Sequence, residues 1–359
     1  MDISFTLPSL LQPADLMTLM RHIKESRNIV ICGHHAPDGD ALGSTLAWQG
    51  YLRALGKKAN VVMPNAHPDF LRWMPQSQTV KNFRDHYAVA RRLIDEADLF
   101  FFLDLNEMQR MQALGSYIAQ HSRAPRLVVD HHLNPKTEEF DLMVSYPDMS
   151  STCELILRLL IELGAYDDLT PTQATQLYTG IMTDTGCFSY SIADPLTFAL
   201  AGMLLRKGID AEEINKNVYH SWSENKLRLW NHILSKNLHT YPEQHTSLYT
   251  LTRQTMKDFH FIRGDAEGLV NEPLKVKGMK LSIALREDTE EDVIRVSLRS
   301  TGGFQCRDMA EQFFNGGGHA NAAGGKLPFP IEEAVKKAEE AIAAYADELK
   351  KPAERNIKD

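Results

Sequence analysis

Short apolar runs alternate with helical patterns through the first half of the chain. The runs at residues 28–32, 59–63, 98–105 and 126–130 predict strands, and residues 41–55 predict a helix that ends at Gly56. Alternation of strands and helices is typical of βαβ units, whose strands form a parallel sheet. The first half therefore predicts an α/β domain built on a parallel sheet.

The pattern changes after residue 150. Residues 150–208 are mainly helical, and residues 212–237 form a polar helical stretch. A strand at 248–251, a hairpin of 280–286 with 293–300, a helix at 308–314, a glycine-rich loop and a last helix at 331–350 follow. We therefore expect an α/β fold with an N-terminal parallel-sheet domain (1–210), a helical connector (211–245) and a smaller α/β domain (246–350).

Composition and charge narrow the classes of function. The chain has 359 residues, of which 43% are hydrophobic and 24% charged, as in an ordinary globular protein of two domains. Its net charge of −8 excludes a generally basic surface for gripping long nucleic acid. Its four cysteines are far apart, and no apolar run approaches the roughly 18 residues of a membrane span. Residues 1–17 do not resemble a signal peptide, so we expect a soluble, cytoplasmic protein.

Titratable residues follow three of the predicted strands. They are His34, Asp38 and Asp40 after the first strand, Asp104 after the third, and Asp130, His131 and His132 after the fourth. Ligands bind beyond the carboxyl ends of the strands in an open α/β sheet, so these residues are expected at one edge. Asp184, near the end of a helical pattern, adds a further carboxylate. Histidine and aspartate are suitable ligands for a divalent metal ion.

Each of these residues also has a purely structural interpretation. Asp40 and Asp104 are possible N-caps of the helices that follow them, Asp184 is a possible capping residue, and single histidines are often structural. Four separate caps explain the joint occurrence poorly. The set therefore favours a metal site.

Together these motifs resemble a known family. The Pro37-Asp38-Gly39-Asp40 loop, Asp104, Asp130-His131-His132 and Thr183-Asp184-Thr185-Gly186 are similar to the four-motif signature of the DHH phosphoesterase superfamily. The segment from Gly316 to Gly324 resembles the GGGHxxAAG motif of the accompanying DHHA1 domain. By size, the chain is most similar to the stand-alone bacterial oligoribonuclease and pAp phosphatase (nanoRNase) subgroup.

The resemblance implies two divalent metal ions, usually Mn²⁺, at the strand ends. His34 and Asp38 would hold one ion, Asp40, His131 and Asp184 the other, and Asp104 would bridge both. Asp104, Asp130 and His132 would act in catalysis, with Asp130 supporting the site and His132 facing the substrate phosphate. Cys187 stands where some relatives carry arginine, so a substrate contact from that position is not expected.

The second domain would bind the substrate. The residues implied are Arg299, Ser300, Gly316, Gly317, Gly318 and His319. Three successive glycines allow backbone amides to approach a phosphate closely. The structural alternatives are a flexible loop for the glycines and a solvated strand position for Arg299.

The resulting hypothesis is a phosphoesterase that acts on very short RNA, on 3′-phosphoadenosine 5′-phosphate (pAp), or on both. Hydrolysis of pApA or cyclic di-AMP is the alternative within the family. A non-catalytic nucleotide-binding regulator is the alternative outside it, and such a protein would be expected to lack some of the six metal ligands. The expected partners are short oligoribonucleotides or nucleoside bisphosphates, without a membrane or long duplexes. Relatives are often homodimers, but no feature of the sequence identifies an interface.

Overall fold

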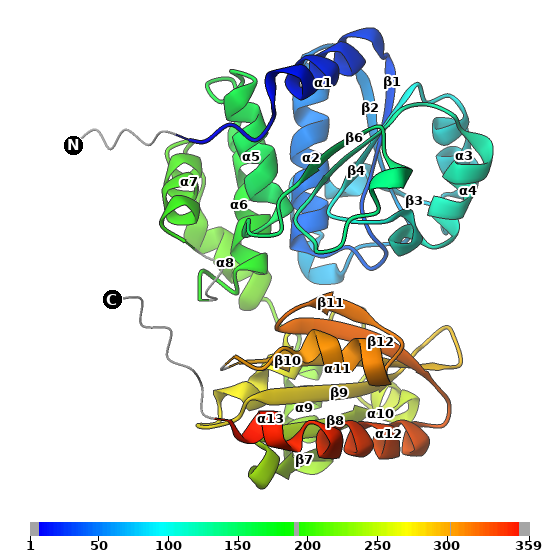
Figure 1. The fold of residues 1–359 in the computed structure, drawn as a ribbon, viewed down its shortest axis with the longest axis vertical. Helices are drawn as coiled ribbons and strands as arrows, with labels where there is room; N and C mark the ends of the chain where they lie inside the picture. The colour runs from blue at the N-terminus through cyan, green and yellow to red at the C-terminus, as the bar shows by residue number, and fades with distance from the viewer. Residues whose placement is uncertain (1–6, 190–193, 302, 352–359) are drawn as a thin grey trace. The chain divides into compact units, whose positions relative to one another are not determined.

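The computed structural model describes residues 7–189, 194–301 and 303–351, which belong to two compact units, Met1–Ser221 and Trp222–Asp359 (Figure 1). The division falls inside the predicted connector, so helix α8 (Ala211–Tyr219) belongs to the first unit and α9 (Glu224–His232) to the second. Each unit contains its own six-stranded sheet. The predicted fold class is therefore confirmed.

The sheet of the first unit is entirely parallel, with the strand order β3-β2-β1-β4-β5-β6. Central strand β4 is buried at all five positions, as expected for a parallel strand covered on both faces. Its run of apolar side chains is what made this strand easy to predict. The strands are β1 (Asn28–Cys32), β2 (Lys58–Met63), β3 (Lys81–Asn82), β4 (Leu99–Leu103), β5 (Arg126–Asp130) and β6 (Leu142–Ser145).

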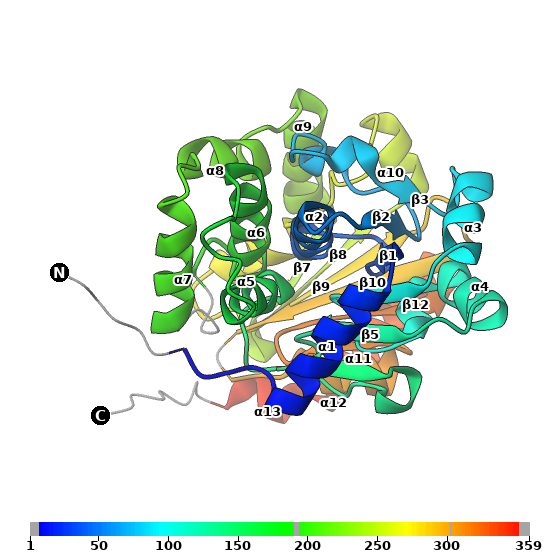
Figure 2. The same ribbon diagram turned by 90° about the horizontal axis from the view of Figure 1, so that it is seen from above.

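Helices cover both faces of this sheet. Buried side chains of α2, α5 and α6 form one hydrophobic core with alternate strand residues, and those of α3 and α4 form a second core with the others. Helices α5, α6 and α7 lie side by side beyond α2 (Figures 1 and 2). The bounds are α1 (Pro13–Glu25), α2 (Gly39–Ala54), α3 (Tyr87–Asp95), α4 (Ala113–His121), α5 (Thr152–Glu162), α6 (Pro171–Asp184) and α7 (Pro195–Leu205), with short helices η1 (Asp69–Leu71), η2 (Ser77–Thr79), η3 (Met108–Met111) and η4 (Thr137–Glu139).

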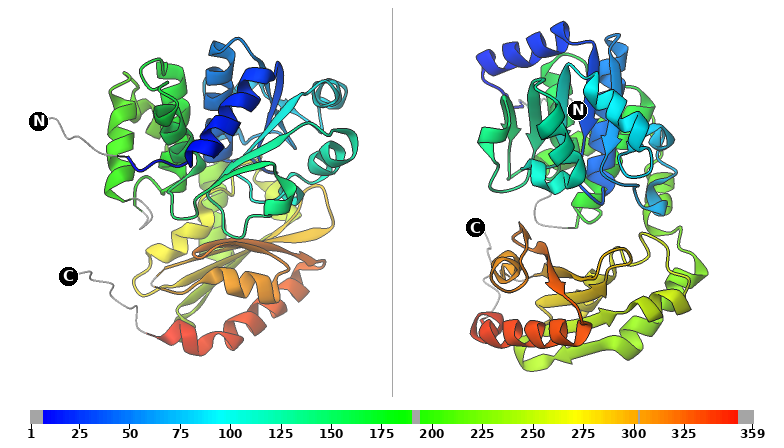
Figure 3. Two further views of the ribbon diagram at one scale, coloured as in Figure 1. Left: turned by 45° about the horizontal axis from the view of Figure 1, so that its top comes forward. Right: turned by 90° about the vertical axis from the view of Figure 1, so that its right-hand side faces the viewer.

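The sheet of the second unit has the order β11-β12-β10-β9-β8-β7, and only its β8–β9 pair is parallel. One face packs on α11 and α12, while α9, α10 and η7 pack on the other face over β8 and β9 (Figure 3). The strands are β7 (Leu238–Tyr241), β8 (Thr246–Leu251), β9 (Leu281–Glu287), β10 (Val293–Ser300), β11 (Gly317–His319) and β12 (Ala322–Pro328). The helices besides α9 are α10 (Arg253–Asp258), α11 (Cys306–Phe313), α12 (Ile331–Ala344) and α13 (Ala346–Lys350), with η5 (Ile233–Asn237), η6 (Pro242–Gln244) and η7 (Leu269–Lys275).

Several details differ from the sequence predictions. Strands β3, β6, β7 and β12 were not predicted. The triple glycine does not open a loop, because Gly317 to His319 form strand β11 on the edge of the second sheet. The last predicted helix is two helices, α12 and α13, with Tyr345 between them. The glycine run contains no β-forming side chains, so its pairing depends on the neighbouring strand rather than on its own propensity.

The helices are short by membrane standards. The longest one in the described part of the chain, α2, has 16 residues, whereas a span takes roughly 20 apolar residues. Among the described residues, no helix combines the length and the apolar character needed to cross a bilayer.

Candidate metal centre

Three neighbouring strands of the first sheet end at the predicted metal ligands. Strand β1 runs into the loop that carries His34 and Asp38, β4 is followed by Asp104, and β5 ends directly before His131. Because β1, β4 and β5 are adjacent and parallel, their carboxyl ends lie at one edge. The first turn of α2 adds Asp40, and the last residue of α6 is Asp184.

Asp104 lies at the middle of this cluster and is only 2% exposed. Its Oδ2 atom is 3.3 Å from His34 Nε2, and its Oδ1 atom is 3.6 Å from His131 Nε2. His34 Nε2 is also 3.7 Å from Asp38 Oδ2. One carboxylate therefore faces two histidines with different oxygens, which is the geometry that a bridging ligand requires.

His131 is the centre of the second group. Its Nε2 atom is 3.2 Å from Asp184 Oδ2 and 3.9 Å from Asp40 Oδ2. The Nδ1 atom of this ring lies 3.1 Å from the carbonyl of Met149, and that of His34 lies 2.9 Å from the carbonyl of His35. In the tautomer in which Nδ1 carries the proton and donates to these carbonyls, both rings present Nε2 to the carboxylates. Many metal-binding histidines are oriented in this way.

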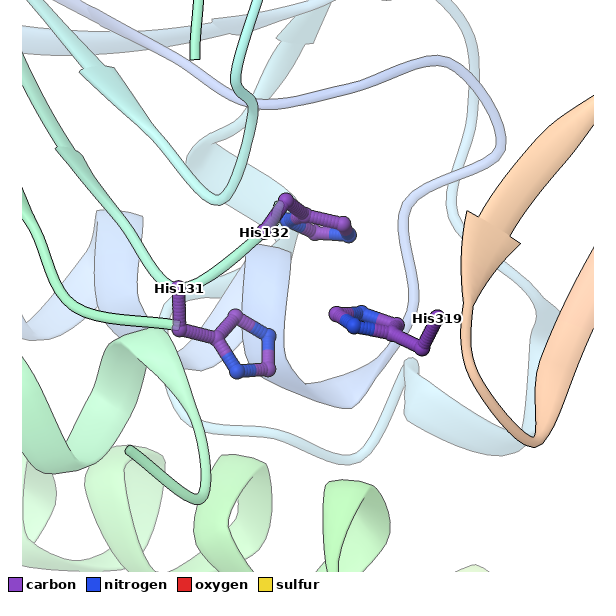
Figure 4. A group of neighbouring side chains, drawn as sticks. All are labelled: His131, His132 and His319. Carbon is purple, nitrogen blue, oxygen red and sulfur yellow. The ribbon is translucent and has the colours of Figure 1, made fainter. Parts of the chain in front are cut away.

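His132 and Asp130 form a pair beside the two groups. His132 Nδ1 lies 2.7 Å from Asp130 Oδ1, and the His132 backbone N–H donates to Asp130 Oδ2 at 3.0 Å. The ring is inclined by 70° to that of His131 (Figure 4). Asp130 thus fixes the direction of the His132 ring.

Burial and mutual charge shift the pKa values of the cluster. Burial lowers the pKa of His34, but the hydrogen bonds to Asp104 and Asp38 outweigh it and raise the pKa to about 10. Burial also lowers the pKa of His131, and the nearby carboxylates, first Asp184, raise it well above its usual value. In a metal-free protein, protonated histidines therefore neutralise part of the carboxylate charge.

The carboxyl groups divide into two kinds. Burial raises the pKa of Asp40, and the charges of Asp104 and Asp184 raise it further. Burial also raises the pKa of Asp184, and together with the charges of Asp38 and Asp104 it outweighs the lowering effect of His131. For Asp104, by contrast, the histidines outweigh burial and hold the pKa well below its usual value. Several carboxylates in one buried cluster are costly without cations, so this donor set fits divalent metal ions.

The backbone of the site corrects two structural interpretations. Asp38, rather than Asp40, is the N-cap of α2, because its carboxylate accepts the N–H groups of Asp40 and Ala41 at 3.1 and 3.0 Å. Asp104 caps no helix, since the next helical turn, η3, begins at Met108 and has Glu107 in the N-cap position. Asp104 has a φ of 63°, a left-handed conformation that is uncommon for a residue with a side chain and is associated with functional sites.

The first turn of α5 also contacts the centre, which the sequence interpretation missed. The N–H groups of Thr152 and Cys153 donate to Asp40 Oδ2 and Oδ1 at 2.7 and 2.8 Å. The Thr152 hydroxyl donates to Asp104 Oδ1 at 3.2 Å. The run Ser150-Ser151-Thr152 before an apolar helix was a recognisable N-cap signal, but nothing in the sequence relates it to Asp40 and Asp104.

Arg110 is a second contact that the sequence did not indicate. Its carbonyl accepts the His35 N–H at 2.8 Å, and its Nη1 donates to the Asp104 carbonyl at 3.5 Å. These bonds tie η3 to the histidine loop. They also place a half-buried cation close enough to His34 to lower the pKa of that ring slightly.

In the second unit, the predicted substrate residues lie on β10 and on or next to β11, the two strands that flank β12. Arg299 of β10 and His319 of β11 are both opposite Ala322 of β12, so the three side chains share one face of the sheet. Buried and half-buried positions alternate along β10, and Arg299 lies on the face away from α11 and α12. His319 is the last residue of β11 (Figure 4).

Ser300 lies on the opposite face of β10 and is 6% exposed. Its hydroxyl donates to the Phe304 carbonyl at 2.6 Å and accepts a hydrogen bond from Asn321 Nδ2 at 2.9 Å. These bonds hold the end of β10 to the segment before β12. The hydroxyl of Ser300 is thus engaged within the fold. The guanidinium of Arg299 donates to the Leu298 carbonyl at 2.9 Å.

The three glycines have different reasons to be glycine. A Cβ at Gly316 would lie 1.8 Å from the Gly324 carbonyl oxygen, and one at Gly318 would lie 2.6 Å from the Ala322 carbonyl oxygen, with φ at 139°. At Gly317 the nearest atom would be Glu311 Oε1 at 4.0 Å. Close packing against β12 therefore requires Gly316 and Gly318, whereas it leaves Gly317 open to another role.

Residues 28–181 match the model of the DHH family, N-terminal domain, and residues 251–350 match that of the DHHA1 domain. The chain belongs to the DHH family and is a phosphoesterase, hence a hydrolase, with a DHHA1 domain in its second unit. The family predicted from the sequence motifs is confirmed.

Three relatives illustrate the similarity. The chain is 28% identical to the bifunctional oligoribonuclease and PAP phosphatase NrnA of Thermus thermophilus, over 88% of this chain and 89% of that protein. It is 27% identical to the cyclic-di-AMP phosphodiesterase PdeA of Listeria monocytogenes, over 91% of this chain but 49% of that protein. The crystal structure of an exopolyphosphatase-related protein from Bacteroides fragilis matches with a TM-score of 0.89 at 39% identity, over 96% of this chain and 100% of that one.

Proposed function

We propose that the protein hydrolyses very short oligoribonucleotides and pAp with the help of two divalent metal ions. The observation that carries this proposal is the position of Asp104, which directs one carboxylate oxygen to His34 and the other to His131. The similarity to oligoribonuclease and PAP phosphatase over nearly the full length of both chains supports the choice of substrates.

Six side chains would hold the ions. His34 and Asp38 would hold one, Asp40, His131 and Asp184 would hold the other, and Asp104 would contribute to both. Four carboxylates and two imidazoles favour a metal such as Mn²⁺ over one that prefers thiolates. The buried thiol of Cys153 lies near Asp40, but burial raises its pKa well above the usual value, so it is a poor ligand.

When bound, the two ions would lower the pKa of a water molecule and offset negative charge on the phosphoryl group. The protein contributes orientation. Asp130 Oδ1 lies 2.7 Å from His132 Nδ1, so Asp130 holds the direction of the His132 ring beside the metal ligands. We assign His132 to contact with the phosphate whose ester bond is cleaved, and Asp130 to the support of its ring.

Arg299, His319 and the backbone N–H of Gly317 are the proposed substrate contacts in the second unit. Arg299 and His319 share a face on which Ala322 is the residue between them, so no large side chain intervenes. Two other basic residues on this face are already paired, Arg295 with Asp288 at 2.6 Å and Lys326 with Glu291 at 3.4 Å. A short row of contacts without a wide basic surface suits mononucleotides and short oligomers rather than long RNA.

Hydrolysis of pApA or cyclic di-AMP is the second candidate. It is supported by the similarity to a cyclic-di-AMP phosphodiesterase, although this chain spans about half of that protein. A purely regulatory nucleotide-binding protein is disfavoured, because all six proposed ligands are present and lie in one cluster.

The test is a comparison of substrates with the purified full chain and added Mn²⁺. We expect turnover of pAp and of di- and trinucleotides, slower turnover of pApA and cyclic di-AMP, and little turnover of a long oligomer. Preference for cyclic di-AMP or pApA would favour the second candidate, and absence of hydrolysis of every substrate would overturn both. Metal analysis of the same sample is expected to give about two Mn²⁺ per chain.

A further inference from the structure

We propose that the first turn of α5 positions the metal-binding carboxylates, and that Thr152 is the side chain through which it controls Asp104. This inference rests on the proposed metal centre and extends it to residues outside the family motifs. Thr152 is a positioning residue here, because it contacts a ligand rather than the substrate.

The first evidence is how Asp40 is held. Both of its carboxylate oxygens accept backbone N–H groups of α5, from Thr152 at 2.7 Å and from Cys153 at 2.8 Å. These N–H groups have no acceptor within their own helix, because they belong to its first turn. The next one, from Glu154, is accepted by the N-cap hydroxyl of Ser151 at 3.0 Å. The N–H groups of Thr152, Cys153 and Glu154 therefore all have acceptors, and the first two define the plane of the Asp40 carboxylate.

The second evidence is the Thr152 hydroxyl. It donates to Asp104 Oδ1 at 3.2 Å, on the side of Asp104 that faces His131, and not to Oδ2, which faces His34. Thr152 thus contacts through its hydroxyl one half of the shared carboxylate and through its N–H the Asp40 carboxylate. Both contacts belong to the group of Asp40, His131 and Asp184. Loss of the hydroxyl is therefore expected to affect one metal ion more than the other.

The third evidence is that this turn cannot shift easily. The buried carboxylate of Glu154 accepts hydrogen bonds from the hydroxyls of Ser150 and Thr197, which connects the start of α5 to the start of α7. Helix α6 also packs directly against it, since a Cβ at Gly180 would lie 2.2 Å from Cys153 Sγ and 2.8 Å from Asp40 Oδ1. A turn held on two sides is able to impose a geometry on Asp40 and Asp104.

The competing interpretation is that Thr152 is only a buried polar residue that stabilises the fold. That role predicts a lower thermal stability of Thr152→Val without a selective change in metal binding. A positioning role predicts a selective loss of affinity for one of the two ions. Metal affinity of each ion is therefore the informative measurement, independent of catalytic activity.

The experiment is a Mn²⁺ titration of the metal-free full chain by calorimetry, with free Mn²⁺ followed by electron paramagnetic resonance. The variants are Thr152→Val, Thr152→Ser and the control Thr45→Val. Thr45 is also fully buried, but its hydroxyl bonds only to backbone carbonyls of its own helix. We expect Thr152→Val to weaken the binding of one of the two ions by about 10- to 100-fold. The affinity for the other ion should stay within about threefold of the wild-type value. In Thr152→Ser and in Thr45→Val, the affinities for both ions should stay within the same range, because the first variant retains the hydroxyl and the second removes one that does not contact Asp104.

Unchanged binding in Thr152→Val, or equal weakening of both ions together with a matching loss of thermal stability, would overturn the inference. Failure of Thr152→Ser to restore the affinity would overturn it as well. If the wild-type chain binds no Mn²⁺ at all, the proposed metal centre fails and the inference with it. These outcomes are distinguishable, because only the last one is seen in the wild type.

Discussion

The two sheets of this protein present functional residues in opposite ways. The parallel sheet delivers them at the ends of β1, β4 and β5, where each strand gives way to a loop and the side chains converge in a buried cluster. The second sheet displays Arg299 and His319 across paired strands, on one face and with a small residue between them. The first arrangement brings charged side chains into one buried cluster, and the second keeps them apart on the surface of a sheet.

This difference has an energetic reason. A cluster of buried carboxylates is stable only with cations, whether protonated histidines or metal ions, so every member depends on the others. On the second sheet, basic residues pair with the acidic turn or, like Arg299, are half-buried away from it. Substitutions are therefore expected to be strongly coupled in the first region and nearly additive in the second.

The largest effect is expected from removing the residue shared by both groups. Asp104→Ala should reduce phosphoesterase activity by at least about 10³-fold, since it removes a ligand from both ions and several kcal/mol of transition-state stabilisation. Activity on pAp with saturating Mn²⁺, together with metal content, is the measurement. Activity within tenfold of the wild type would show that the cluster is not the catalytic centre.

The next effect concerns pH and distinguishes a metal centre from a set of ion pairs. The pKa of His34, raised to about 10, and that of His131, also raised, mean that metal binding must displace protons from both rings. Mn²⁺ affinity should therefore increase with pH, by about tenfold per pH unit for each proton displaced. Calorimetric titrations between pH 6 and 8, in buffers of different ionisation enthalpy, measure the slope and the protons released. A flat affinity would contradict the assignment of the histidines as ligands.

The third effect compares two arginines on the same face of β10. Arg299→Ala should lower kcat/KM by about 10- to 100-fold, since a charge-assisted hydrogen bond contributes about 1.5 to 3 kcal/mol. Arg295→Ala is the matched control and should stay within about threefold, because Arg295 is already paired with Asp288 and Glu291. Metal content should be the same in both variants. Equal losses of activity in the two variants would mean that Arg299 does not contact the substrate more directly than Arg295 does.

The smallest effect separates the structural from the functional glycines of the run at residues 316–318. Gly316→Ala should destabilise the protein by about 1 to 3 kcal/mol, because its Cβ would collide with the backbone of β12. Gly317→Ala should leave the free energy of unfolding nearly unchanged and raise KM, since its Cβ has room in the fold but limits approach of a phosphate to the backbone. Denaturant unfolding and steady-state kinetics measure the two effects. A KM for Gly317→Ala equal to that of the wild type would remove this glycine from the proposed substrate site.

Much of the fold was predictable because its signals are local. The apolar runs of β1, β4 and β5 and the alternation along β10 are strong enough to identify these strands within one or two residues. Strands β3, β6, β7, β11 and β12 were not identified. The two residues of β3 carry no period, and the Gly317–His319 strand exists because β12 offers it partners.

The candidate metal centre was predictable for a different reason. Each of its motifs lies at an element end, and the topology rule for parallel sheets brings such ends together. The capping roles were assigned less well, since Asp38 rather than Asp40 caps α2, and Asp104 caps nothing. A capping bond depends on the dihedral angles of a few residues, which composition and periodicity do not determine.

The sequence by itself determined the family, the α/β class of both units and the identity of the residues that cluster around Asp104, because these follow from short motifs and hydrophobic periodicity. Only the tertiary structure decided which residues hold that cluster in place. Thr152 meets Asp104 across 48 positions of chain and Asp40 across 112, and no local pattern encodes such contacts. They arise when α5 packs beside α2 and α6 with its first turn directed at the carboxylates. Long-range packing therefore converts a set of recognisable motifs into a site of defined geometry.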